Sequence, residues 1–166
     1  MPRSSTMTPS RVRTVALAAV LLLAVAGFSA CEEATPRSAS TAGDEAAAAA
    51  RSQVGTPYQW GGREPGVGFD CSGLTSWSWE QAGVAIPRTS RDQYAASARI
   101  RVEDLRPGDL VFYAANGSTI SHVAMYVGDD TLVHGRSSVS HVVKDQLSTW
   151  WTDALVGYGR VADPAV

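Results

Sequence analysis

Polar and apolar residues of this chain first follow a helical pattern. Two acidic residues followed by five alanines predict a helix over residues 44–54, because acids favour a helix N-terminus and alanine has the highest helix propensity. Asp70 and Gly83 are typical of the two ends of a second helix, whose first turn contains Cys71. A short third helix is expected over residues 89–97.

The pattern then changes to short runs of β-branched and aromatic residues separated by turn residues. These runs predict strands at residues 110–113, 122–127, 131–134, 139–143 and 155–161. Between the first two predicted helices, residues 56–69 form a glycine-rich loop with interspersed aromatic residues. Helices first and strands afterwards predict an α+β fold built on an antiparallel sheet.

The N-terminal region has a different pattern. An apolar run from Val15 to Phe28 follows a short basic stretch that contains Arg11 and Arg13. The run has about 14 residues, whereas a membrane-spanning helix needs about 20. Residues 1–30 are therefore predicted to be an export signal.

The residues after this signal suggest a tether. Phe28-Ser29-Ala30-Cys31 is similar to a bacterial lipobox, which predicts a lipid on Cys31 and attachment to the membrane. Two alternatives stay open: ordinary cleavage with an incidental thiol, and a disulfide between Cys31 and Cys71. Small and polar residues predict a flexible linker over residues 31–43, so the globular domain is expected over residues 44–166.

The charge of the chain excludes one class of partner. Lys and Arg total 14 against 16 Asp and Glu, which gives a net charge of −2 at neutral pH. The predicted signal contains Arg3, Arg11 and Arg13 and no acidic residue, so its removal changes the net charge to −5. Nucleic-acid binding is therefore not expected, because neutralising phosphates requires a basic surface.

Cys71 is the candidate nucleophile. A thiol reacts as the thiolate, and both a helix N-terminus and a nearby imidazolium lower the pKa of a cysteine. The position of Cys71 supplies the helix N-terminus, and His122 is expected to supply the imidazolium. Asp70 is expected to point at the helix amides as their cap, because its charge would oppose thiolate formation if it faced the sulfur.

Two histidines are candidates for the other catalytic roles. His122 and His134 lie in predicted strands joined by the tight turn Gly128-Asp129-Asp130, and such a hairpin places both rings on one face. His122 is then the base, and His134 is the group that orients it. His141 is expected at the surface and is the alternative orienting group. A zinc site formed by Cys71 and the two histidines is a further alternative, although close paired spacing is lacking.

Ordered segments of the chain resemble the NlpC/P60 cysteine peptidases of bacterial cell walls. The resemblance covers essentially all of residues 44–162. The segments that carry it are Gly55-Thr56-Pro57-Tyr58-Gln59-Trp60-Gly61-Gly62, Phe69-Asp70-Cys71-Ser72-Gly73-Leu74, Ile86-Pro87-Arg88-Thr89-Ser90, Arg106-Pro107-Gly108-Asp109-Leu110-Val111-Phe112, His122-Val123-Ala124-Met125-Tyr126-Val127-Gly128, Leu132-Val133-His134 and Gly157-Tyr158-Gly159-Arg160-Val161.

This resemblance implies a papain-like fold and a reaction. It implies hydrolysis of the bond between D-glutamate and the diamino acid in the stem peptides of peptidoglycan. Cys71 is implied as the nucleophile, His122 as the base and His134 as the polar orienting residue, with no metal or cofactor.

Further roles follow from the same resemblance. Tyr58 is implied to help bind the carbonyl oxygen, and Asp70 and Ser72 resemble positions that contact the substrate amine in some members. The prediction is a monomeric, exported and lipid-anchored peptidoglycan endopeptidase. A non-catalytic wall-binding lipoprotein and a thiol amidase or acyltransferase on another amide or ester stay open. Trp150 and Trp151 are expected in the core or at a cleft edge, without a chemical role.

Overall fold

The computed structural model describes residues 39–115 and 117–162. The predicted signal over residues 1–30, the predicted lipidation site Cys31 and the first part of the linker lie outside the described residues and stay predictions. Within the described ranges, every helix is too short or too polar to traverse a lipid bilayer.

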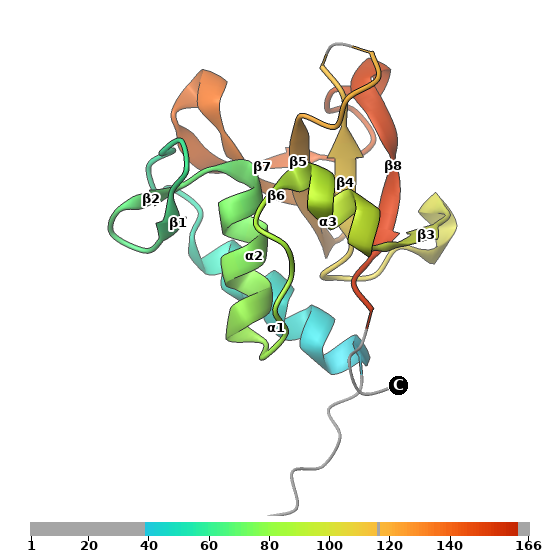
Figure 1. Ribbon diagram of the computed structural model, residues 1–166, viewed down its shortest axis with the longest axis horizontal. Helices are drawn as coiled ribbons and strands as arrows, with labels where there is room; N and C mark the ends of the chain where they lie inside the picture. The colour runs from blue at the N-terminus through green and yellow to red at the C-terminus, as the bar shows by residue number, and fades with distance from the viewer. Residues whose placement is uncertain (1–38, 116, 163–166) are drawn as a thin grey trace, which may run out of the picture. The chain divides into compact units, whose positions relative to one another are not determined.

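Three α-helices precede the strands of the main sheet along the described chain (Figure 1). They are α1 (Ala39–Ser52), α2 (Cys71–Gln81) and α3 (Ser90–Ala96). Helix α2 begins directly after Asp70 and ends just before Gly83, whose φ of 79° only glycine adopts readily. The predicted second and third helices are therefore confirmed.

Helix α1 begins earlier than the sequence predicts. It starts at Ala39, five residues before the predicted start, so residues 39–43 are helical and the prediction of a linker there is wrong. At Gly43 the helix approaches the turn before β4 so closely that a Cβ would lie 2.6 Å from the Pro107 carbonyl oxygen. Packing of this kind stabilises a helix beyond what local propensity predicts.

The main sheet has six antiparallel strands in the order β3-β8-β4-β5-β6-β7. Its strands are β3 (Ala98–Ile100), β4 (Leu110–Tyr113), β5 (His122–Gly128), β6 (Thr131–Arg136), β7 (His141–Gln146) and β8 (Leu155–Arg160). A small hairpin of β1 (Arg63–Glu64) and β2 (Gly68–Phe69) lies inside the glycine-rich loop. The predicted α+β fold with an antiparallel sheet is confirmed.

Three short 3₁₀ helices connect these elements: η1 (Val102–Asp104), η2 (Ser137–Val139) and η3 (Thr152–Ala154). Helix η2 displaces the fourth predicted strand, because Ser140 adopts a left-handed φ of 60° and β7 begins only at His141. The sequence pattern does not predict β3, an edge strand with two exposed residues and no run of large apolar side chains.

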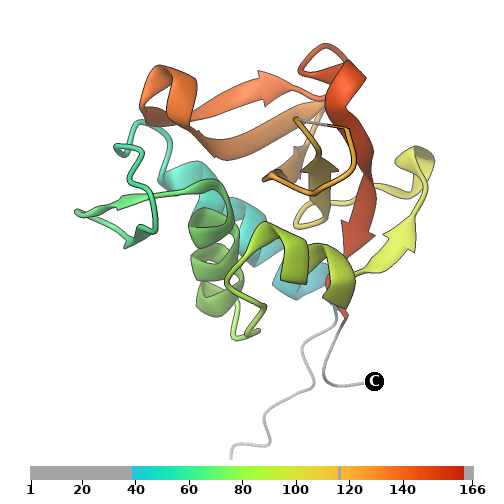
Figure 2. The ribbon, with the colours of Figure 1, turned by 45° about the horizontal axis from the view of Figure 1, so that its top comes forward.

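Helices α1 and α2 pack on one face of the sheet (Figure 2). The main core lies between these helices and the central strands, and it includes Leu74 of α2 and the strand residues Phe112, Val123, Met125 and Val133. The opposite sheet face carries a smaller apolar cluster that Trp150 and Leu155 help to cover. The start of α2 and the start of β5 both lie beside the same cavity.

Candidate active site

Cys71 is the first residue of α2, and Asp70 is the N-cap of this helix. The backbone of Asp70 is extended (φ −85°, ψ 177°), and its Oδ1 accepts a hydrogen bond from the Gly73 N–H at 2.6 Å. The carboxylate thus points at the helix amides, as the sequence predicts. Cys71 has a free thiol and lies in the wall of a cavity.

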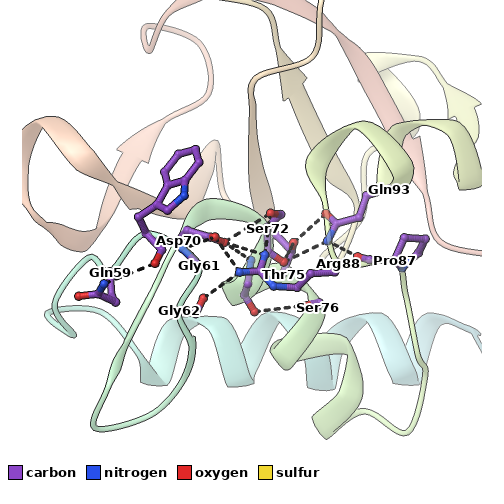
Figure 3. A network of polar contacts seen from close by, with 12 residues as sticks. Gln59, Gly61, Gly62, Asp70, Ser72, Thr75, Ser76, Pro87, Arg88 and Gln93 are labelled. Atoms are coloured by element: carbon purple, nitrogen blue, oxygen red, sulfur yellow. Dashed lines mark hydrogen bonds and ion pairs between the residues drawn. The ribbon is translucent and has the colours of Figure 1, made fainter.

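Arg88 binds the same carboxylate (Figure 3). Its Nη2 donates to Asp70 Oδ2 at 2.7 Å and its Nη1 to Oδ1 at 3.0 Å, and the Gly61 N–H donates to Oδ2 at 3.0 Å. Arg88 Nη1 also donates to Ser72 Oγ at 3.1 Å. The sequence pattern does not predict a role for Arg88, although this residue lies in one of the segments that carry the family resemblance.

The glycine-rich loop packs directly on the start of α2. The Gly62 carbonyl oxygen accepts a hydrogen bond from the Asp70 N–H at 3.1 Å, and a Cβ at Gly73 would overlap this oxygen. Only glycine therefore allows this close approach. The Tyr58 N–H donates to the Ser140 carbonyl oxygen at 2.8 Å, and this part of the loop brings Tyr58 to the cavity wall.

The cavity has a volume of about 990 Å³, at the upper end of the range for small-molecule sites. Of the predicted site residues in the described ranges, all but His134 line this cavity, and His134 is completely buried. The residues that line the cavity include Tyr58, Trp60, Asp70, Cys71, Ser72, Arg88, His122, Arg136, Trp150 and Trp151.

His122 and His134 are hydrogen-bonded to each other. Met125 of β5 pairs with Val133 of β6, and this register places both histidines on one face of the sheet. Their Nε2 and Nδ1 atoms, respectively, are 2.8 Å apart. His141 is exposed and turns its Nδ1 to a backbone carbonyl oxygen. The structure thus brings His134, and not His141, to His122.

Asp145, on the neighbouring strand β7, is hydrogen-bonded to His134. His134 Nε2 lies 2.9 Å from Asp145 Oδ2, and Arg136 Nη1 donates to the same oxygen at 3.0 Å. Pairing of Leu132 with Asp145 puts the carboxylate on the face that carries His134. The sequence pattern does not predict Asp145 as a site residue, because the predicted strand ends at residue 143 and nothing local reveals the register with β6.

Two tryptophans cover the histidines. The ring of Trp150 lies 4.3 Å from the ring of His134 and 5.3 Å from that of His122, measured between centroids. Trp151 stacks on Tyr113 at 5.7 Å, and Tyr113 in turn contacts Trp150 at 4.7 Å. This aromatic cover limits the access of water to the two imidazoles.

The resting state of Cys71 differs from the expectation. Burial is the largest influence on the Cys71 thiol and raises its pKa. A hydrogen bond from the Val123 N–H lowers the pKa, the Asp70 charge raises it, and hydrogen bonds from Ser72 lower it. The prediction of a lowered thiol pKa is therefore wrong, because burial outweighs the hydrogen bonds that lower the pKa. The contact with Val123 places the sulfur beside the residue that follows His122 in β5.

The histidines are neutral at neutral pH. Burial lowers the pKa of His134 to about 3, and the nearby Arg136 charge acts in the same direction. Burial also lowers the pKa of His122 and is the largest cause, and repulsion from His134 and Arg136 lowers this pKa further. A neutral imidazole beside a neutral thiol can accept the thiol proton as the sulfur attacks.

Acid is expected to destabilise the fold through these two histidines. Their pKa values lie below the value of about 6.5 of an unfolded histidine, so the unfolded state binds more protons between about pH 6.5 and 3. The free energy of unfolding then decreases as the pH falls through this window, by up to about 1.4 kcal/mol per pH unit for His134 and less for the partly exposed His122. Denaturant unfolding at a series of pH values measures this slope.

His141→Gln is the matched control, because it removes an exposed histidine. It should keep the wild-type slope, whereas His134→Gln should make the free energy of unfolding clearly less dependent on pH. The same slope in His134→Gln and in the wild type would contradict the buried neutral state.

Within the described residues, no group of three or more His, Cys, Asp or Glu side chains is placed to hold a metal ion. Both ring nitrogens of His134 already face protein partners, namely His122 and Asp145. The geometry therefore gives no support to the zinc alternative.

Comparison with known proteins places this site in a family context. A family model described as the NlpC/P60 family matches residues 55–160. The chain is 41% identical to the bifunctional muramidase/DL-endopeptidase CwlT of Bacillus subtilis (strain 168) over 109 residues. This match covers 64% of this chain and 33% of CwlT. It is 34% identical to the gamma-DL-glutamyl hydrolase of the same organism over 132 residues, and this match covers 76% of this chain and 32% of the hydrolase. The chain thus spans about a third of the length of these curated relatives.

A solved structure supports the fold. The peptidoglycan hydrolase RipB of Mycobacterium tuberculosis matches with a TM-score of 0.61 and 30% sequence identity, over 72% of this chain and 64% of that chain.

Proposed function

The chain belongs to the NlpC/P60 family, and from this premise we propose that it is a cysteine endopeptidase that hydrolyses the stem peptides of peptidoglycan. One observation carries the proposal: Cys71 and His122 line one cavity, and His122 is hydrogen-bonded to the buried His134. A nucleophile, a base and a group that orients the base are the parts that acyl transfer needs.

The proposed scissile bond joins D-glutamate to the following diamino acid. The names of two relatives specify a DL bond, and one of them specifies a glutamyl bond. Arg88 and Arg136 line the cavity with part of each side chain exposed. Guanidinium groups pair well with carboxylates, so this lining suits an acidic peptide.

In the first step, the Cys71 sulfur attacks the amide carbon while the thiol proton passes to His122. The oxyanion that forms lies at the N-terminus of α2, where the N–H of the first helical residue has no acceptor within the helix. Tyr58 is the second donor. Burial is the largest cause that raises the pKa of Tyr58, and the charges of Cys71 and Asp70 raise this pKa further. The hydroxyl of Tyr58 therefore keeps its proton and can donate it in a hydrogen bond.

In the second step, the His122 imidazolium gives its proton to the leaving amine, and the C–N bond breaks. The resulting thioester on Cys71 is then attacked by water, whose proton His122 accepts. The acyl product leaves with a new carboxylate, and the thiol regains a proton. His134 contacts His122 throughout and stabilises the imidazolium in each step.

Recognition of a substrate amine by Asp70 and Ser72 stays a prediction. Both oxygens of Asp70 already accept hydrogen bonds from Arg88, and the guanidinium would repel an ammonium group placed beside them. The observed contacts favour a positioning role, in which Asp70 ties the glycine-rich loop and Arg88 to the start of α2.

Digestion of purified muropeptides tests the proposed function. Liquid chromatography with mass spectrometry should detect one fragment that ends in D-glutamate and one that begins with the diamino acid. Cys71→Ala should give neither. Fragments cut at another bond would favour the amidase alternative, and the absence of fragments from every stem peptide would favour the wall-binding lipoprotein.

We also propose that the protein is exported and anchored through a lipid on Cys31. The signal pattern of residues 1–30 supports this placement, and the substrate of cell-wall hydrolases lies outside the cytoplasm. Cys31→Ala is expected to move the protein from the membrane fraction to the soluble or secreted fraction. Cys71→Ala is the control that should remain with the membrane, and membrane retention of Cys31→Ala would contradict the anchor.

A further inference from the structure

Asp145 ends a row of hydrogen-bonded side chains that crosses three adjacent strands. His122 on β5 contacts His134 on β6 at 2.8 Å, and His134 contacts Asp145 on β7 at 2.9 Å. His134 has no exposed surface, and Trp150 lies against its ring. The two protein contacts therefore decide which nitrogen of His134 carries a proton.

The contact between Arg136 and Asp145 reveals the direction of the last hydrogen bond. A guanidinium can only donate, so Asp145 Oδ2 accepts the hydrogen bond that Arg136 Nη1 makes at 3.0 Å. His134 Nε2 contacts this same oxygen. His134 must therefore donate through an Nε2–H to Asp145.

The remaining protons follow along the row. A neutral imidazole has one N–H, so His134 Nδ1 carries a lone pair and accepts from an Nε2–H of His122. His122 is also neutral, and its own lone pair is consequently on Nδ1. This is the ring nitrogen that His134 leaves available, on a residue that lines the cavity together with Cys71.

We propose that Asp145 is a positioning residue that acts through His134 to keep the lone pair of His122 on Nδ1, ready to accept the Cys71 proton. Its effect on catalysis rests on the proposed peptidase function, whereas the proton arrangement does not. When His122 becomes an imidazolium, its Nε2–H still donates to His134, and the Asp145 carboxylate strengthens His134 as an acceptor.

The proton arrangement is directly measurable by long-range ¹H–¹⁵N NMR of the imidazole nitrogens. In the wild type, both His122 and His134 should be protonated on Nε2. Asp145→Leu removes the acceptor at similar size and should give a mixture of tautomers at both rings. Asp145→Ala is the smaller alternative if the leucine variant does not fold. Arg136→Met is the matched control, because it removes the ion pair but keeps the carboxylate, and it should retain both tautomers.

Kinetics give the second measurement. Asp145→Leu should lower kcat on a stem peptide by about 10²-fold with KM changed less than about twofold, the size of a general-base contribution. The rate of Cys71 alkylation by iodoacetamide should fall as well. Unchanged tautomers and an unchanged alkylation rate in Asp145→Leu would overturn the proposal. If the wild type cleaves no stem peptide, the proposed function fails, but the tautomers still decide the role of Asp145.

Discussion

Replacing Cys71 with serine is expected to lower kcat/KM for a stem peptide by at least about 10⁴-fold. A hydroxyl holds its proton far more tightly than a thiol, and neutral His122 is too weak a base to remove it readily. The side chain is partly exposed at the cavity wall, and serine has nearly the same shape, so the fold should not change. Steady-state kinetics and the melting temperature measure the two effects separately.

Ser78→Ala is the matched control on the same helix. Ser78 is buried in α2 away from the cavity, and its hydroxyl has no hydrogen-bond partner in the structure, so its removal leaves no polar group unpaired. Activity should equal that of the wild type. If Cys71→Ser retained more than about a tenth of the wild-type activity, Cys71 would not be the nucleophile.

Replacing His122 with glutamine is expected to lower kcat by about 10³-fold. Glutamine can still hydrogen-bond to His134, but it cannot accept the thiol proton or return it to the leaving amine. Because burial already raises the pKa of Cys71, no preformed thiolate replaces the missing base. Burst-phase kinetics would locate the loss in acylation, and KM should change little.

His141→Gln is the corresponding control, because His141 is exposed on β7 and makes no contact with the row of His122, His134 and Asp145. It should have wild-type kcat. Equal activity losses in the two glutamine variants would show that His122 has no special role as a base.

Local signals made much of the site predictable. The start of α2 depends on the Asp70 cap, which contacts an amide only three residues away. The hairpin that joins the two histidines depends on the turn at Asp129 and Asp130, whose φ angles of 51° and 54° are those of a tight hairpin turn. Both features involve neighbours in the sequence, so residue types alone indicate them.

Contacts between distant residues were not predictable in this way. Arg88 meets Asp70 across 18 positions, and Asp145 meets His134 only because β6 and β7 pair in one particular register. The pKa of Cys71 was predicted in the wrong direction for the same reason. Its value depends on burial by elements that follow later in the chain, whereas the helix N-terminus is visible locally.

Mass analysis of the protein during turnover tests the central claim most directly. The protein is mixed with a stem peptide in excess, quenched in acid at short times, digested, and searched for a mass adduct. We predict an adduct on the peptide that contains Cys71, equal in mass to the acyl half of the substrate, which ends in D-glutamate, and absent from Cys71→Ala. Product formation by Cys71→Ala at the wild-type rate, with no adduct in either protein, would contradict the account.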